Sequence, residues 1–524
     1  MSSTLDGLLL GFEGALTPEL LLAAFIGALV GTLVGLLPGL GSVAGAALVL
    51  PLVYSMEPAA ALVVIAAVYA GTMYGGSTTS VLMNMPGEAS AVVATFDGYP
   101  MTRKGRAGAA LSVMAVGSFI AGTIALVLVT LLAPLLARSA LAFGPAEYFA
   151  LTLGGLLVLA RLGGGSPMSG LLPMIIGLAL STVGQEAITG NFRFTFDVTE
   201  LSVGIGIVPI AVGVFGIAEL MTALEDRTPG GRRPVAPRLR ELFPNREEWR
   251  RSWAPWGRGS ILGFLFGLLP GPSGVLSTFA AYRVEKAVSK HRDELGTGAV
   301  EGIAAPEAAN NAASMGSLIP VLSLGIPFSA TLAVMISAMI TMGVQPGPLL
   351  AEQRPDIFWG VIVSLYVANV MLLVLNLPLV GVWVSILRIP QKYLIPGIVV
   401  IAVIGGYSVR GSMVDVYVLL AAGIVGYVLR KLDFSMASLI IGLVLGPLIE
   451  KHLREGLFLS RGELSYFVST PISITVWSLV LLALVGGAVA ARRDRLRRRR
   501  LAAEQATGES KSGSEPPVAI DDRR

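Results

Sequence analysis

Ten stretches of this chain contain no charged residue over a length close to, or above, that of a membrane crossing. A helical crossing takes about 20 residues, so the longest stretches must hold two passes or a re-entrant pair. A membrane barrel would instead show short segments of alternating hydrophobicity. The pattern therefore predicts an all-α polytopic membrane protein with roughly 12 hydrophobic segments. The stretches are residues 20–56, 58–87, 107–137, 162–185, 201–218, 259–282, 308–351, 357–387, 393–409 and 470–491.

Composition agrees with this class and excludes several kinds of chemistry. Charged residues make up 14% of the 524 residues, whereas soluble domains carry roughly 25%. The absence of cysteine excludes disulfides, thiolate metal sites and a cysteine nucleophile. The two histidines, His291 and His452, both lie among charged residues near predicted membrane ends. No cofactor is expected.

Basic residues cluster beside the hydrophobic segments and form no separate basic domain, which argues against a nucleic-acid partner. By the positive-inside rule, the stretches 103–106, 226–258, 283–294 and 492–500 are cytoplasmic, and so is the C-terminus. The segment 189–200 is then an external loop. The predicted organisation is an N-terminal segment 1–18, a first transmembrane half 19–225, a basic linker 226–258, a second transmembrane half 259–491 and a basic, disordered tail 492–524.

An internal repeat is the most informative motif. "GTLVGLLPG" at 31–39 and "GFLFGLLPG" at 263–271 share seven of nine residues. A second related pair follows, "GSTTSVLMNMPGEA" at 76–89 and "GSLIPVLSLGIPFSA" at 316–330. Two related halves that each contain two broken apolar segments are typical of secondary transporters, in which the halves are often inverted. The sequence therefore predicts two related, inverted repeats with Pro/Gly-broken or re-entrant helices.

The broken helices suggest a binding chemistry. In hydrocarbon an unsatisfied backbone group costs several kcal/mol, so a break must face protein or a wet cavity. The half-helix after a break presents N–H groups that suit a carboxylate. Carbonyls at the end of the half-helix before it suit sodium. For any single hydroxyl, a bond back to its own helix is an equally good explanation.

Neutral polar side chains and glycines around the breaks supply the candidate ligands. The predicted substrate contacts are Gly39, Gly41, Ser42, Ser77, Thr78, Asn84, Gly271, Ser273, Asn310, Asn311 and Ser329. The predicted sodium contacts are Asn84, Ser80, Ser323 and Thr331.

The segment "EGIAAPEAANNAASMGS" at 301–317 carries the most unusual polar pattern. Pro306 can open a helix at its first position, which places Glu307, Asn310 and Asn311 on one face. Adjacent asparagines are poor helix formers, so a ligand or ion contact is the better explanation. The alternative is that Glu307 is an acid at the N-terminus of a helix and that the two asparagine amides are solvated at the membrane edge.

Two other acids allow two interpretations. Glu88 and Asp97 lie in "NMPGEASAVVATFDGYPMTRKGR", which approaches a cytoplasmic boundary. Each is either functional or an interfacial partner for Arg103 or Lys104.

These motifs together resemble the large membrane subunit of the tripartite tricarboxylate transporters, the TctA family. The resemblance covers roughly residues 20–480 and rests on "GLLPGLGS", "YGGSTTSVLMNMPGEAS", "TFDGYPMTRKGRAG", "GLLPGPSG", "EGIAAPEAANNAASMGSLIPVLSLGIPFSATLAVM", "GGYSVRGSMVDV" and "GLVLGPLIEKHLREGLFLSRG". It implies an inner-membrane secondary transporter that imports citrate-like or other carboxylates on a sodium or proton gradient. It also implies a small TctB-like membrane subunit and a periplasmic TctC-like solute-binding protein. Pro272 departs from the usual small-residue pattern, which leaves the substrate contacts there open.

The residues themselves restrict the substrate less than the resemblance does. No Arg or Lys lies within the two breaks, so helix N-termini and amides must recognise the anion, and a mono- or dicarboxylate fits as well as citrate. Two other function classes remain as alternatives. An intramembrane hydrolase built on Ser273 lacks a nearby histidine or lysine base. A carboxylate or ion channel would also use half-helices, but would not accumulate its substrate.

Overall fold

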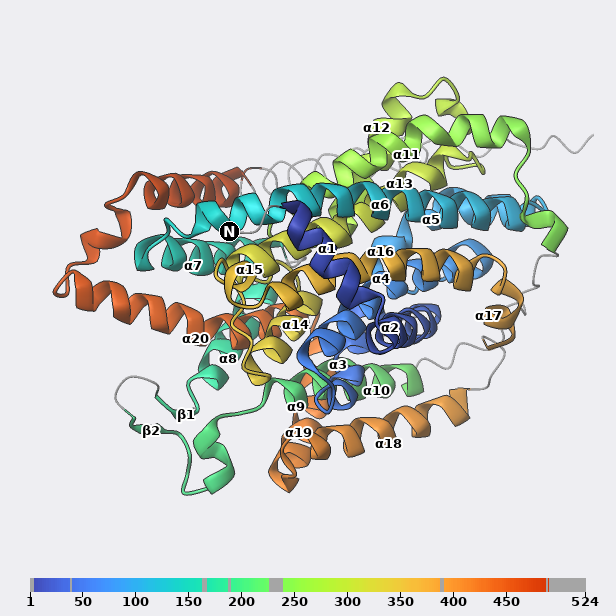
Figure 1. Cartoon of the computed structure of the whole chain (residues 1–524). Helices are drawn as coiled ribbons and strands as arrows, with labels where there is room; N and C mark the ends of the chain where they lie inside the picture. The colour runs from blue at the N-terminus through green and yellow to red at the C-terminus, as the bar shows by residue number, and fades with distance from the viewer. Residues whose placement is uncertain are drawn as a thin grey trace, which may run out of the picture.

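The computed structural model describes residues 4–37, 40–162, 167–186, 190–225, 239–386, 391–486 and 489. Gly39, the tail 492–524 and residues 226–238 of the predicted linker lie outside these ranges. The chain is almost entirely helical (Figure 1). The α-helices are α1 (Thr4–Ala15), α2 (Pro18–Leu36), α3 (Gly41–Val53), α4 (Pro58–Met83), α5 (Ala94–Arg103), α6 (Ala107–Ala140), α7 (Pro145–Leu162), α8 (Pro167–Ser181), α9 (Ile207–Ala211), α10 (Ala218–Glu225), α11 (Arg246–Gly267), α12 (Ser273–Val288), α13 (Glu301–Gly316), α14 (Ala330–Thr341), α15 (Leu350–Gln353), α16 (Pro355–Asn376), α17 (Val380–Ile386), α18 (Gln391–Arg410), α19 (Met413–Lys431) and α20 (Met436–Leu459).

Short elements connect these helices. Strands β1 (Gly184–Gln185) and β2 (Phe192–Arg193) form a small antiparallel hairpin in which Gly184 pairs with Arg193. Two π-helical segments, η3 (Val212–Ile217) and η6 (Pro320–Leu324), interrupt longer helical stretches. The 3₁₀ turns are η1 (Ala89–Val92), η2 (Thr199–Val203), η4 (Leu239–Leu242), η5 (Arg292–Glu294) and η7 (Leu464–Val468).

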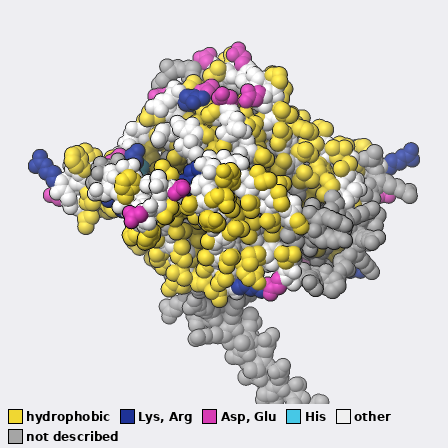
Figure 2. Space-filling view, turned by 90° about the horizontal axis from the view of Figure 1, so that it is seen from below, with side chains coloured by type: hydrophobic (Ala, Val, Ile, Leu, Met, Phe, Trp, Pro, Cys, Tyr) yellow, Lys and Arg dark blue, Asp and Glu magenta, His cyan; other side chains and the backbone are white. Residues whose placement is uncertain are grey.

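The predicted membrane class is confirmed. Among the described residues, six helices are long and apolar enough to cross a membrane, namely α2, α4, α6, α16, α19 and α20. Seven shorter apolar helices accompany them, including the second members of two broken pairs, α3 and α14. One face of the molecule is covered largely by hydrophobic side chains, and charged side chains gather mostly toward its margins (Figure 2). Such a surface suits the hydrocarbon of a bilayer.

Each predicted break interrupts a helix. In the first half, α2 ends at Leu36 and α3 begins at Gly41, whose φ of 67° favours glycine. In the second half, α11 ends at Gly267 and α12 begins at Ser273. Farther on, η6 ends at Leu324, and its C-cap Gly325 also has a positive φ, before α14 starts at Ala330. The Gly and Pro residues of the motifs therefore separate half-helices as expected.

Both halves use glycine to pack the broken helix against a continuous partner. Because glycine has no side chain, α2 approaches the backbone of α4 closely, and α11 approaches α13 in the same way. This local packing is shared, while the inverted relation between the halves stays a prediction. The facing residues are Gly27 with Val64, Gly31 with Val68 and Gly35 with Thr72 in the first half, and Gly259 with Ala305, Gly263 with Ala309 and Gly267 with Ala313 in the second.

This packing predicts that Gly31→Val destabilises the protein. A Cβ on Gly31 would lie 2.5 Å from the carbonyl oxygen of Val68, and backbone cannot rotate away as a side chain can. We expect a loss of about 3 kcal/mol, typical of severe overpacking. Thermal unfolding in detergent measures the effect, with Gly14→Val as the control because no neighbour lies within 4 Å of a Cβ there. Equal stability of both variants would contradict the packing role.

Candidate functional site

A cavity of about 400 Å³ lies where both broken pairs meet. It is lined by Ser42 at the first break, by Gly271 and Ser273 at the second, and by Ser329 and Thr331 before and within α14. Segments separated by nearly 300 residues in the chain therefore surround one space. Two direct hydrogen bonds link them: the hydroxyls of Ser42 and Thr331 lie 2.9 Å apart, and the Gly271 N–H donates to the Phe328 carbonyl at 3.3 Å.

Four helices present their N-termini to this cavity. Residues of the first turn, or the residue just before it, line the cavity from α3, α12, α14 and α20. Each helix N-terminus carries roughly half a positive charge, so four provide roughly two. The α14 and α20 ends are capped by their own serines: Leu332 N–H donates to Ser329 Oγ at 3.3 Å, and Ser438 N–H donates to Ser435 Oγ at 3.4 Å.

The other two N-termini differ in what they bind. At α12, the N-cap residue Pro272 forms no side-chain cap, so the first turn faces the cavity without a capping side chain. At α3, a carboxylate already occupies the end: Ser42 N–H donates to Glu88 Oε2 at 2.8 Å, and Ser42 Oγ donates to Glu88 Oε1 at 3.0 Å. An acid at a helix N-terminus is the favourable arrangement. The chain thus shows, with its own side chain, how this end holds a carboxylate.

Asn310 contributes a buried amide with unused hydrogen-bonding capacity. Its side chain is 0% exposed, and among the described residues neither its Nδ2 nor its Oδ1 has a hydrogen-bond partner. It lines the cavity opposite α12, since a Cβ on Gly274 would lie 3.3 Å from Asn310 Oδ1. An unsatisfied buried amide costs roughly 1–3 kcal/mol unless a ligand or water supplies the partner. A ligand carboxylate in the cavity would accept from Nδ2.

The charge of the lining is unusual for an anion site. Among the described residues that line it, Glu88 is the one charged side chain, and no Lys or Arg contributes. Among the described lining residues, the helix N-termini are therefore the source of positive charge. Sequence reasoning left Glu88 undecided between a functional role and an ion pair with Arg103 or Lys104. Glu88 instead accepts hydrogen bonds from the backbone N–H and the hydroxyl of Ser42.

Asp97, the other undecided acid, is held away from the cavity by a loop of the second half. It accepts backbone N–H groups from Gly296, Gly298 and Ala299, with Gly298 the nearest at 2.7 Å. The hydroxyl of Tyr282 also donates to it, at 3.0 Å. Asp97 thus fixes α5 to the loop before α13.

The remaining predicted contacts lie outside the cavity lining. Gly41 is adjacent to the lining, because a Cβ added to it would lie 3.8 Å from Glu88 Oε2. Asn84 is exposed and forms the C-cap of α4 in a left-handed conformation. The others use their polar groups within the protein. Ser77 donates to Glu307 Oε1, Asn311 donates to Ser118 Oγ, and Thr78, Ser80 and Ser323 donate to the carbonyls of Tyr74, Gly76 and Ala133.

Sequence reasoning missed several residues of the lining. Tyr69, Met73, Ser90, Ser435 and Ser438 all face the cavity. Ser435 had a usable signal, because a serine directly before an apolar run is a typical N-cap. The other four carry no local pattern that separates them from packed core residues.

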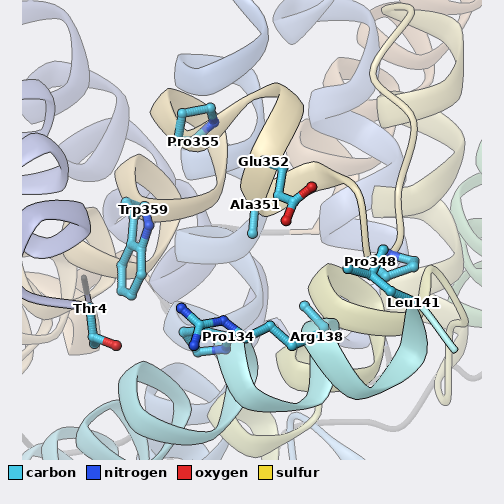
Figure 3. Close-up of a pocket in the computed structure, with 10 residues that line it drawn as sticks. Thr4, Pro134, Arg138, Leu141, Pro348, Ala351, Glu352, Pro355 and Trp359 are labelled. Atoms are coloured by element: carbon cyan, nitrogen blue, oxygen red, sulfur yellow. The ribbon is translucent and has the colours of Figure 1, made fainter. Parts of the chain in front are cut away.

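A second cavity, of about 360 Å³, lies elsewhere in the fold (Figure 3). It opens between α1, α6 and the α15–α16 region, where Arg138 and Glu352 are its charged side chains and Trp359 forms one wall. None of the described residues predicted to bind substrate or sodium lines it. It is therefore a useful reference site for experiments on the first cavity.

Comparison with known proteins agrees with these observations. The model of the family described as "Tripartite tricarboxylate transporter TctA family" matches residues 21–441. The chain is similar to the "Uncharacterized 52.8 kDa protein in TAR-I ttuC' 3'region" of Agrobacterium vitis, with 46% identity over 485 residues that cover 93% of this chain and 96% of the relative.

A second Agrobacterium vitis relative, the "Uncharacterized protein in TAR-II ttuC' 3'region", is 46% identical over 223 residues, which cover 43% of this chain and 92% of the relative. No solved structure matches the chain. The family model covers most of the chain, and its proteins are components of a transporter rather than enzymes. This multi-pass membrane protein therefore belongs to the tripartite tricarboxylate transporter TctA family.

Proposed function

We propose that the cavity between the two breaks is the substrate site of a secondary transporter that imports carboxylates. The observation that carries this proposal is the convergence of four helix N-termini and the unpaired Asn310 amide on one cavity without Lys or Arg. Backbone N–H groups and an amide can hold a carboxylate and still release it, which transport requires.

The charge of the cavity favours a substrate with one or two carboxylates. Four N-termini supply roughly +2, and an ionised Glu88 offsets about one unit of that. The remaining charge of roughly +1 matches a monocarboxylate, or a dicarboxylate that binds together with one further cation. Citrate as a trianion requires more neutralisation, from a proton or sodium ion that enters with it.

Sodium remains a candidate coupling ion beside the proton. Of its predicted contacts, Thr331 lines the cavity, whereas Ser80 and Ser323 bond to backbone carbonyls and Asn84 is exposed. We place the protein in the inner membrane with its C-terminus in the cytoplasm. A periplasmic solute-binding protein would deliver the carboxylate, and a small membrane subunit would complete the complex.

Uptake into vesicles tests this function. The chain is reconstituted with the small subunit and the solute-binding protein of the complex, and uptake of radiolabelled acetate, succinate and citrate is followed with and without inward sodium and proton gradients. We expect accumulation of at least one of them above its external concentration. Equilibration without accumulation would indicate a channel, and no movement of any carboxylate would contradict the proposal.

Ser42→Ala is expected to lower uptake about tenfold, with normal membrane insertion. The substitution removes the hydroxyl that joins Glu88 to Thr331, and a hydrogen bond to a charged group contributes about 1.5–3 kcal/mol. Initial uptake rates at equal amounts of inserted protein measure the effect. Ser55→Ala is the control, because that exposed hydroxyl bonds only the Leu52 carbonyl among the described residues. Unchanged uptake in Ser42→Ala would remove Ser42 from the site.

A further inference from the structure

Glu88 occupies the position that a substrate carboxylate would take at α3. Its two oxygens accept the Ser42 backbone N–H and the Ser42 hydroxyl, at 2.8 and 3.0 Å. Both donors belong to the first turn of α3, one of the four helix ends that face the cavity. The resident acid and the substrate therefore compete for the same positive potential.

Two carboxylates cannot share this cavity easily while both are ionised. No Lys or Arg lies among the described lining residues to separate them, and the cavity holds only about 400 Å³. Like charges at close range in a partly desolvated site disfavour the doubly ionised state. Substrate binding thus requires either movement of Glu88 away from the cavity or its neutralisation.

Movement is the less favourable route. The Glu88 side chain is anchored at two donors of one residue, and its backbone lies between α4 and η1 against glycine-lined packing, where a Cβ on Gly76 would be 3.1 Å from the Glu88 N and Cβ atoms. Neutralisation needs only the addition of a proton to one oxygen. A protonated Glu88 becomes a donor, and the Ser42 N–H loses its anionic acceptor and becomes available to the substrate.

We propose that Glu88 is the proton-binding site that couples proton entry to carboxylate binding in this transporter. The inference rests on the proposed function and assigns the coupling ion and its residue. Glu88 gains one proton when substrate binds, and no other covalent bond forms or breaks. The proton leaves Glu88 when substrate is released on the other side of the membrane.

Few other titratable groups face Glu88 among the described residues. Tyr69, from α4, is the one other titratable side chain among the described residues of the lining, and α3, α12, α14 and α20 contribute neutral residues to it. Glu307 and Asp97 are acids of the helices α13 and α5 and lie outside the cavity lining. Glu307 accepts from Ser77 at Oε1, whereas its Oε2 has no partner among the described residues, and Asp97 is bound by the loop at Gly298.

Proton uptake on binding is the first test. Citrate or succinate is added to the purified complex in lightly buffered detergent solution with a pH indicator. The wild-type protein should take up about one proton per bound substrate near neutral pH, and Glu88→Gln should take up none while still binding substrate. No proton uptake by the wild type would overturn the assignment, and this result does not depend on how the variant folds.

Gradient dependence is the second test, made in vesicles. Glu88→Gln should still exchange internal for external substrate, yet a pH gradient should no longer drive accumulation. Glu57→Gln, an exposed acid before α4, should behave as wild type. Accumulation in Glu88→Gln driven by the pH gradient as in wild type, or wild-type accumulation driven by sodium alone, would overturn the proposal. Absence of exchange in the wild type would instead contradict the transport function itself.

Discussion

Asn310→Ala is expected to reduce carboxylate uptake about 10- to 100-fold without loss of the fold, because a hydrogen bond to a charged ligand contributes about 1.5–3 kcal/mol. Asn310 forms no side-chain hydrogen bond among the described residues, so its removal breaks none that stabilise the unliganded protein. The change should appear as weaker substrate binding, measured by the concentration dependence of uptake. Its unfolding temperature in detergent should match that of the wild type.

Asn376→Ala is the matched control for this prediction. Asn376 is also a buried helical asparagine, but its Nδ2 donates to Thr32 Oγ1 at 3.1 Å and to the Leu372 carbonyl at 2.9 Å. Its removal should lower stability and leave substrate affinity unchanged. If Asn310→Ala instead lost stability and kept its affinity, the amide would be a structural group and the site would lie elsewhere.

Ser273→Asp should abolish uptake, with a reduction of more than about 100-fold. Ser273 is the first residue of α12, the helix end that no side chain caps, and it faces the cavity. An aspartate there would place a second resident carboxylate where the substrate anion is expected. The same acid should stabilise α12 through its dipole by about 0.3–1 kcal/mol, so stability and transport should change in opposite directions.

Ser273→Asn separates charge from size in this experiment. Asparagine is nearly isosteric with aspartate and neutral, so uptake should stay within about tenfold of wild type, the effect of one altered neutral hydrogen bond. Radiolabelled uptake and thermal unfolding are measured on all three proteins. Equal uptake by the Asp and Asn variants would contradict an electrostatic role for the α12 N-terminus.

The sequence predicted the helical membrane class and the positions of the breaks because both depend on local chemistry. Uncharged runs specify spanning helices, and "LLPG" interrupts them wherever it occurs. Ser42 and Ser273 were identified in the same way, since each lies in or beside a break motif, and Asn310 was identified from the unusual polar pattern of residues 301–317. These residues do meet at one cavity.

The rest of the site depends on contacts between distant segments, which one sequence does not encode locally. Ser435 comes from α20, far from either repeat motif, and reaches the cavity only through tertiary packing. Ser80 and Ser323 are the same residue type as the cavity-lining Ser42 and Ser329, yet their hydroxyls donate to backbone carbonyls within the protein. Glu88 was ambiguous because its partner, Ser42, precedes it by 46 residues across a helix hairpin.

Substrate protection of a single thiol tests the central assignment most directly. The chain has no cysteine, so Ala89→Cys introduces the one reactive thiol at an exposed residue that lines the cavity, and Ala351→Cys does so at the second cavity. Labelling by a water-soluble thiol reagent is followed in the transport-competent complex with and without saturating transported carboxylate. We predict that substrate slows labelling at position 89 about tenfold or more and leaves position 351 unchanged. Equal labelling at position 89 with and without a substrate that the variant still transports would contradict the account.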